Sequence, residues 1–277
     1  MEQIVKISTD EPVYLVQKVD HIDESTSQTA LVTDEHDFWS SLSYSNNKRR
    51  QTNISILHDA SFFCKKKISR LYFNTQCLPN QSLLKLGGRK VLCQFVPSLR
   101  RAHGPGAIFP LTSAQRHLFS VDYHHEGGAR HWYIIPSCEK ITLQTIIHKQ
   151  NSSICPDHGQ ILIDPSVLDK YHVRYHRIIQ HPNEFVILSA GTLTQSFTED
   201  AGWSESIEFA LPSWIKDGHA NVSVSPCQCG IPVDSLSTTT DVTLFTHKLI
   251  QRYITSHLNV ITNDNKSVPL KGSQLYP

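Results

Sequence analysis

The sequence predicts a mainly β fold with flanking helices, a barrel or a sandwich rather than a doubly wound sheet. Beyond residue 110, short runs of apolar, aromatic and β-branched residues recur, and Gly, Asn, Asp or Pro separates them. Little helical pattern lies between these runs, whereas a parallel α/β sheet alternates strands with helices. The chain has 277 residues, of which 39% are hydrophobic and 18% charged, so it can bury a sizeable core.

The first 110 residues carry weak structural signals. Residues 1–35 are polar and mixed. We expect a flexible loop at residues 20–29 and the start of a short helix at Asp37–Leu42. The basic run at residues 48–50 is typical of a solvated loop, and its alternative is a weak nuclear-localisation or phosphate-binding patch. Within residues 53–110 the pattern is mixed, and loops are predicted where Pro and Gly cluster, at Gly87–Gly88 and His103–Pro110.

The pattern becomes clearer after Pro110. Period-two alternation or short apolar runs predict strands at His117–Tyr123, Trp132–Ile135, Gln160–Ile163, Arg177–Ile179, Glu184–Leu188 and Ile207–Leu211. Helices are predicted at Glu139–Lys149 and at Ser166–Tyr171, the second after an Asp164 cap followed by proline. Asp241–His257 has the clearest helical spacing, and Asp241 is a suitable N-cap.

Charge and composition exclude several classes of protein. Lys and Arg number 26 against 25 Asp and Glu, a net charge of +1, so we expect no direct binding of nucleic acid. No apolar run reaches the roughly 18–20 residues that a membrane helix needs, and acidic residues stand near the N-terminus where a signal peptide is apolar. We therefore expect an intracellular protein with no membrane partner. Seven cysteines, an odd number, argue against a disulfide framework.

Two short turns offer ligands for zinc. Cys227 and Cys229 form a Cys-x-Cys pair, and Cys155 and His158 form a Cys-x-x-His pair beside Pro and Gly. A structural zinc ion takes four such ligands in a tetrahedron. The alternative is that these are four unrelated residues. The remaining thiols are predicted to be small buried side chains, at Cys64, Cys77, Cys93 and Cys138.

From about Phe109 to Gly218 the chain resembles the JmjC (jumonji) family of 2-oxoglutarate-dependent dioxygenases. The segments that carry the resemblance are LFSVDYHHEGGARHWYIIP, ILIDPSVLDKYHVRYHRIIQ, NEFVIL and ESIEFALPSWIKDG. The chain looks most like the histone lysine demethylase branch, which carries an extra Cys/His zinc site. The resemblance implies a double-stranded β-helix, a jelly-roll or cupin-like barrel, which agrees with the strand-rich pattern. It also places the family's zinc ligands on His158, Cys227 and Cys229, with Cys155 as the fourth ligand in a shortened loop.

The same resemblance implies a degenerate iron site. The family binds Fe(II) through a His-x-Asp/Glu pair and a second His, and these positions fall on Thr112, Ala114 and Thr194. A threonine hydroxyl is a poor neutral ligand and alanine offers no donor atom. We therefore expect neither Fe(II) nor 2-oxoglutarate to bind. The alternative is a metal site rebuilt from neighbouring residues, among them His117, His124 and His125.

The positions that bind the co-substrate in the family are also changed. The family's carboxylate-binding Lys falls on Arg130 and its Asn falls on Asp122, while Ser206 keeps a position that lines the pocket. Arg130 either binds a carboxylate or forms a salt bridge with Asp122 that fills an emptied pocket. The tyrosines that surround methyl-lysine in this branch fall near Leu99–Arg101, where aromatic residues are missing.

Together these features predict a catalytically inactive JmjC-like domain, a chromatin-associated binding or scaffold module stabilised by structural zinc. Histone- or chromatin-associated proteins are the expected partners, and the nucleus, or otherwise the cytoplasm, the expected location. One alternative is an active Fe(II)/2-oxoglutarate oxygenase with non-standard iron ligands; another is a domain that binds a regulatory carboxylate at Arg130. The predicted organisation is an N-terminal region (1–100), a barrel core (101–219), a zinc segment with a helix (220–260) and a tail (261–277).

Overall fold

The computed structural model describes residues 2–6, 13–18, 34–43, 50–51, 53–63, 75–114, 117–150 and 161–217, together with single helical residues at 248, 251 and 255. Most of the predicted helix Asp241–His257 lies outside the described residues. So do all four predicted zinc ligands, Cys155, His158, Cys227 and Cys229. The zinc site and the division of the chain into domains therefore stay predictions.

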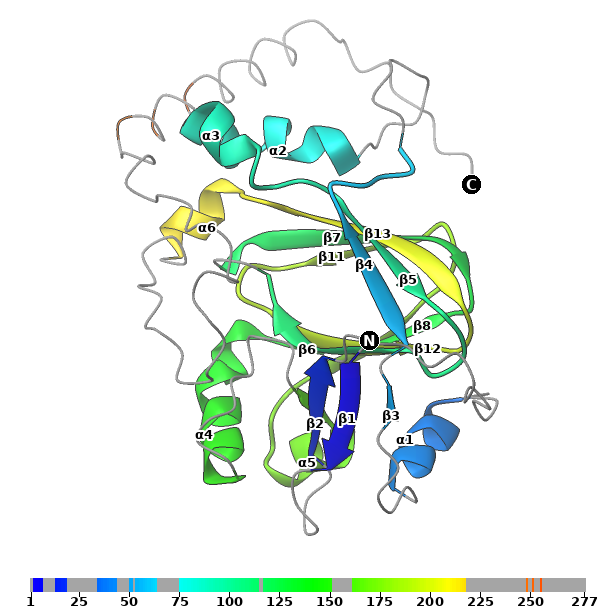
Figure 1. Ribbon diagram of the computed structural model, residues 1–277. Coiled ribbons are helices and arrows are strands. Elements are labelled where there is room, and N and C mark those ends of the chain that lie inside the picture. The colour runs from blue at the N-terminus through cyan, green and yellow to red at the C-terminus, as the bar shows by residue number, and fades with distance from the viewer. Residues whose placement is uncertain are drawn as a thin grey trace, which may run out of the picture.

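Two antiparallel sheets face each other and enclose the interior of a barrel (Figure 1). The strands of the larger sheet follow the order β11-β7-β13-β5-β4, and those of the smaller sheet the order β10-β8-β12-β6. Their bounds are β4 (Ile54–His58), β5 (Ser98–Ala102), β6 (Ile108–Ser113), β7 (Phe119–Gly127), β8 (Arg130–Ile135), β10 (His176–Gln180), β11 (Phe185–Leu188), β12 (Leu193–Thr198) and β13 (Gly202–Phe209). This arrangement confirms the predicted fold class, a mainly β barrel of the jelly-roll type with flanking helices.

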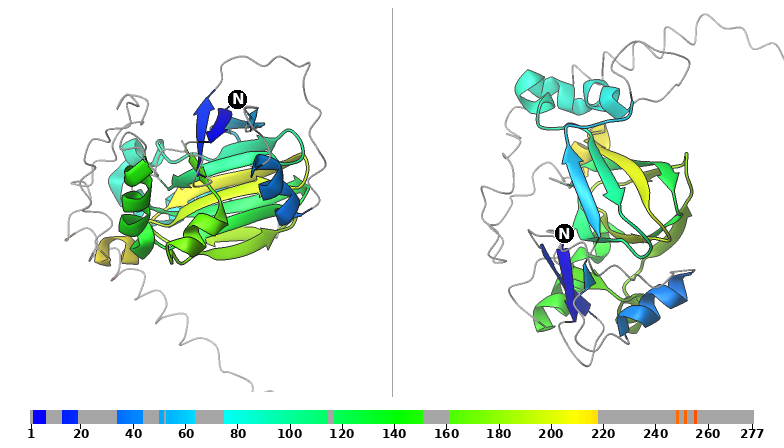
Figure 2. Two further views of the ribbon diagram at one scale, coloured as in Figure 1. Left: turned by 90° about the horizontal axis from the view of Figure 1, so that it is seen from below. Right: turned by 45° about the vertical axis from the view of Figure 1, so that its right-hand side comes forward.

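A third sheet and three helices cover the outer face of the smaller sheet (Figure 2). The third sheet has the order β3-β1-β2-β9. These elements are β1 (Glu2–Lys6), β2 (Val13–Lys18), β3 (Arg50–Gln51), β9 (Ile161–Ile163), α1 (Glu35–Ser43), α4 (Lys140–Gln150) and α5 (Pro165–Lys170). Apolar side chains of β9, α4 and α5 pack on Leu111, Ile135 and Leu193 of the smaller sheet.

Helix α1 is attached to the same sheet through aromatic contacts. The ring of Phe38 stacks on Phe197 of β12, with ring centroids 3.9 Å apart. The indole N–H of Trp39 donates a hydrogen bond of 2.7 Å to the hydroxyl of Tyr133 on β8. Burial raises the pKa of the Tyr133 phenol, which therefore stays protonated at neutral pH.

Short helices pack against apolar side chains of the larger sheet, among them Val121, Ile207 and Phe209. They are η1 (Thr75–Cys77), α2 (Leu78–Gln81), η2 (Leu83–Gly87), α3 (Gly88–Leu92) and α6 (Pro212–Lys216), and η4 (Ser137–Glu139) precedes α4. Leu83 and Leu84 pack with the fully buried Trp214 of α6. Within the described residues, no helix is both long and apolar enough to cross a membrane.

Several elements and side chains differ from the sequence-based predictions. The predicted loop His103–Pro110 contains the start of β6 at Ile108, and Gly87–Gly88 joins η2 to α3. Strand β12 was not predicted, because its inward residues are polar and its sequence lacks apolar alternation. The predicted burial of Cys77, Cys93 and Cys138 is wrong: all three are exposed, since they lie on short helices or helix ends at the surface.

Candidate functional site

The structure brings two of the three predicted iron positions together. Thr112 of β6 and Thr194 of β12 are direct partners in the antiparallel register, so their side chains share one face of the sheet. The neighbours of Thr194 along β12 point outward: Leu193 packs in the outer core and Gln195 binds the backbone of β9. Thr194 therefore points into the barrel. Ala114 follows β6 and packs against the apolar cluster around Leu118 and Trp214.

These residues do not fit a ferrous ion. Fe(II) in this class of site is held by two imidazoles and one carboxylate, whereas the three positions present two neutral hydroxyls and a methyl group. In the part of the chain that the structure describes, no three His, Cys, Asp or Glu side chains are grouped so that they could hold a metal.

The histidines near this site point in different directions. His124 is buried on the inner face of β7, where its ring nitrogens lie 3.2 and 2.9 Å from the carbonyl oxygens of Trp203 and Gly128. His125, the next residue, is 3.2 Å from the carboxylate of Glu205 on the outer face. The ring of His117 lies 3.3 Å from the ammonium nitrogen of Lys140. The structure thus does not bring these three histidines together.

Arg130 and Asp122 form an ion pair in the interior of the barrel. Nη1 of Arg130 lies 3.2 Å from both carboxylate oxygens of Asp122, and the two side chains are only 2% and 3% exposed. The guanidinium also donates to Ser196 of β12 at 2.9 Å and to Ser204 of β13 at 3.2 Å. This ion pair is one of the two arrangements that the sequence left open for Arg130.

Two aromatic rings enclose the same guanidinium. Its central carbon is 3.8 Å from the ring centroid of Phe109 and 3.9 Å from that of Trp132. Burial lowers the pKa of Arg130 to about 10, although the attraction of Asp122 opposes this shift. Arg130 therefore remains positively charged at neutral pH, with its charge paired and its faces covered.

Little space remains beside Arg130 for a ligand. Ser206 is the register partner of Asp122, is also buried, and lies on the same inner face. A cavity bordered by Arg100, Phe109, Arg130, Thr198 and Ser204 has a volume of about 10 Å³. That is room for about one water molecule, and a dicarboxylate such as 2-oxoglutarate is several times larger.

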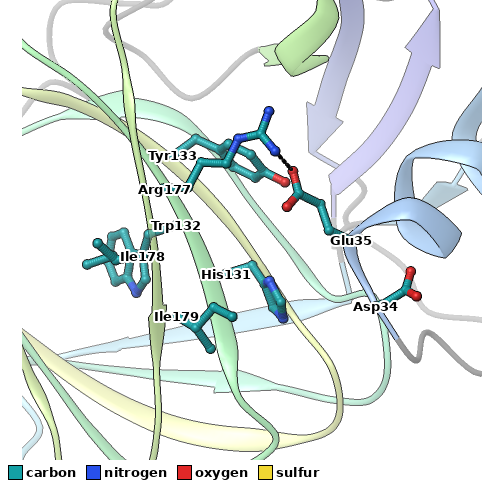
Figure 3. Close-up of a pocket in the computed structure, with 8 residues that line it drawn as sticks. All are labelled: Asp34, Glu35, His131, Trp132, Tyr133, Arg177, Ile178 and Ile179. Atoms are coloured by element: carbon teal, nitrogen blue, oxygen red, sulfur yellow. Dashed lines mark ion pairs between the residues drawn. The ribbon is translucent and has the colours of Figure 1, made fainter.

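A larger hollow lies outside the barrel, between α1 and the outer face of β8 and β10. Its volume is about 360 Å³, and it is lined by Asp34, Glu35, His131, Trp132, Tyr133, Arg177, Ile178 and Ile179. Figure 3 shows the ion pair between Arg177 and Glu35, 2.9 Å long, at one end and Ile179 beside His131 at the other. Sequence reasoning missed this hollow, because Glu35 and Arg177 belong to distant segments. The exposure of Ile179, 53%, follows from its place on a strand at the edge of the described sheet.

Comparison with known proteins yields one family and several relatives. The family model described as "JmjC domain, hydroxylase" matches residues 104–209. "Multicopy suppressor of chk1 protein 1" of Schizosaccharomyces pombe is 31% identical over 38% of this chain and 7% of its own length. "Protein Jumonji" of Gallus gallus is 29% identical over 38% of this chain and 9% of its own length. "Probable lysine-specific demethylase 4F" of Homo sapiens is 30% identical over 41% of this chain and 18% of its own length. The chain therefore spans only a small part of each of these relatives.

Proposed function

Because residues 104–209 form a JmjC domain, we propose that the chain acts as a catalytically inactive member of that family, a binding or scaffold module associated with chromatin. The observation that carries the proposal is the donor chemistry at the iron positions. Thr112 and Thr194 are paired across β6 and β12, yet they and Ala114 supply neither imidazole nor carboxylate. The filled interior around Arg130 supports the same conclusion, since a co-substrate would have to break the ion pair with Asp122.

Turnover of 2-oxoglutarate tests this proposal. The purified chain is incubated with Fe(II), ascorbate, 2-oxoglutarate and a panel of trimethyl-lysine peptides, and succinate is measured. We expect no succinate above that of a blank without protein. An authentic lysine demethylase assayed in parallel is the positive control. Succinate formation that depends on the peptide would reject the proposal in favour of an active oxygenase with non-standard iron ligands.

We further propose that a structural zinc ion stabilises the module. The proposed ligands are Cys155, His158, Cys227 and Cys229, whose residue types and resemblance to the family's ligands support a closed tetrahedral site. We expect about one zinc per chain by atomic emission, and loss of the metal together with a lower Tm in the double variant Cys227→Ser/Cys229→Ser.

The matched control for the zinc site is the double variant Cys77→Ser/Cys93→Ser, which removes two exposed thiols. It should keep both the zinc content and the Tm of the unmodified chain. Equal zinc content in the two double variants would contradict the proposed ligands.

The proposed location in the nucleus and the proposed chromatin partners rest on analogy with the family and on the basic run at residues 48–50. The hollow shown in Figure 3 supports a binding role, because it combines exposed apolar residues with charged groups of both signs, the ion pair of Glu35 with Arg177 and the carboxylate of Asp34. A fluorescent fusion of the chain that stayed cytoplasmic would contradict the proposed location.

A further inference from the structure

Two guanidinium groups face a single carboxylate inside the barrel. Oδ2 of Asp122 lies 3.2 Å from Nη1 of Arg130 and 3.5 Å from Nη1 of Arg100. One carboxylate neutralises only one of the two positive charges. The second charge belongs to Arg100, whose side chain is 32% exposed, so solvent reaches it on one side while the buried pair of Arg130 and Asp122 lies on the other.

Two polar atoms next to this cluster have no hydrogen-bonding partner among the described residues. They are Nε of Arg100 and Oγ1 of Thr198. Thr198 is only 2% exposed, so bulk water does not satisfy its hydroxyl. Arg100 and Thr198 both line the cavity of about 10 Å³ described above. A buried donor without a partner is unfavourable, which indicates that this cavity holds a particle that accepts hydrogen bonds.

We propose that this cavity binds one monatomic anion, chloride in the cell. The ion accepts hydrogen bonds from Nε of Arg100 and from the hydroxyl of Thr198. A water molecule would satisfy both donors, whereas a halide would accept the same hydrogen bonds and also balance the second guanidinium. The volume of about 10 Å³ suits an occupant of about the size of one water molecule, and the side chain of Arg100, 32% exposed, connects the cavity with solvent. The site depends on these atoms alone and not on whether the protein turns over 2-oxoglutarate.

Anomalous diffraction tests the position of the ion. Crystals of the full chain grown in sodium bromide are measured at the bromine absorption edge. We expect one anomalous peak within contact distance of Arg100 and Thr198, and its loss in crystals of Thr198→Val. Density without an anomalous signal at this position would identify a water molecule and overturn the inference.

Thermal stability tests the site in solution. Sodium chloride replaces sodium gluconate at constant ionic strength, and the Tm is followed. We expect a saturable rise in Tm for the unmodified chain and for Thr198→Ser, because a ligand that binds only the folded state stabilises it. The rise should disappear in Thr198→Val and in Arg100→Gln.

The matched control is Arg101→Gln. This exposed neighbour lies on the same strand, with its guanidinium over the ring of Trp203, and its loss removes the same charge outside the cavity. Arg101→Gln should keep the full response to chloride. If Arg100→Gln does not fold, the test rests on the chloride-dependent rise in Tm of Thr198→Ser compared with that of Thr198→Val. An equal response in these two threonine variants would refute the halide site.

Discussion

The side chain of Arg130 lies in the barrel interior and contacts both sheets. Its planar group donates to Ser196, Ser204 and Asp122 while two aromatic rings cover its faces. The lysine that the family resemblance places here has a compact ammonium group with neither a flat face nor a fork of donors. Arg130 and Asp122 thus form a paired polar core at positions where the family resemblance implies a ligand pocket.

The first prediction concerns this ion pair. Asp122→Ala should lower the free energy of unfolding by about 3–5 kcal/mol, because it leaves the Arg130 charge buried and unpaired. Urea denaturation followed by tryptophan fluorescence measures the change. The double variant Asp122→Ala/Arg130→Met should recover much of the loss, since it removes the unpaired charge.

The control for this prediction is Glu126→Ala, which removes an exposed carboxylate from the same strand. It should change the stability little. A loss of less than about 1 kcal/mol in Asp122→Ala would mean that solvent reaches Arg130 and that the ion pair is not a closed unit.

Strand β12 has polar side chains on both faces, and their hydrogen bonds come from neighbouring elements. On the inner face, the hydroxyl of Ser196 accepts a hydrogen bond from Arg130. On the outer face, the amide of Gln195 accepts a hydrogen bond from the N–H of Ile163 at 2.9 Å and donates one to its carbonyl oxygen at 2.6 Å. These contacts connect β12 to β9 of the third sheet. Ser196 and Gln195 find their hydrogen-bonding partners only in the assembled structure, which explains why the segment has no strand pattern in the sequence.

Glu205 connects β13 to residues that lie between β4 and β5 in the chain. Its carboxylate is fully buried and accepts hydrogen bonds from the hydroxyl of Ser61 at 2.6 Å and the N–H of Phe62 at 3.0 Å. Thr75 and His125 also contact it. Burial alone would raise the pKa of Glu205, but these hydrogen bonds outweigh it and hold the pKa below its usual value.

The second prediction follows from this lowered pKa. A carboxylate with a lower pKa in the folded state stabilises the protein above the unfolded pKa, about 4.3 for glutamate, and loses this contribution as the pH falls through the folded pKa. Glu205→Gln should therefore be less stable at pH 7, and its stability should fall less steeply between about pH 5 and 3.

Urea midpoints measured across this pH range test the prediction. Glu126→Gln, an exposed carboxylate on the adjacent strand β7, is the control and should keep the slope of the unmodified chain. If Glu205→Gln showed that same slope, the carboxylate of Glu205 would contribute nothing to acid sensitivity.

In the molecule as a whole, the predicted iron positions and the predicted co-substrate positions lie on different pairs of strands. The iron positions lie where β6 and β12 pair in the smaller sheet. The co-substrate positions connect β8 of that sheet with β7 and β13 of the larger one. Restoring one part should therefore leave the other unchanged.

The third prediction tests this separation. The triple variant Thr112→His/Ala114→Asp/Thr194→His should gain binding of about one Fe(II) per chain, because the facing register of Thr112 and Thr194 suits two ligands of one ion. It should still form no succinate, because the ion pair of Arg130 and Asp122 occupies the co-substrate pocket. Iron content and succinate are measured side by side, with Thr112→Ser/Thr194→Ser as the control that adds no ligand. Succinate from the triple variant would show that the pocket is open.

Local sequence patterns were sufficient to predict several strands and helices. The strands at β7, β8, β10 and β11 and the helices α4 and α5 were predicted because their alternation, caps and proline positions act over a few residues. The resemblance to the family added the barrel and the identity of the altered iron positions. The ion pair of Asp122 and Arg130 was predicted as one of two outcomes, since opposite charges at neighbouring pocket positions favour pairing.

Contacts between distant segments could not be predicted in this way. The pairing of Thr112 with Thr194, the covering of Arg130 by Phe109 and Trp132, and the unsatisfied atoms of Arg100 and Thr198 all depend on how the strands of the two sheets are aligned. Strand register and the space left between packed side chains arise from cooperative burial of the whole chain. The spacing of residues in the sequence determines where strands and helices form. The cavity beside Arg130 depends on how the two sheets pack, so the sequence alone did not predict it.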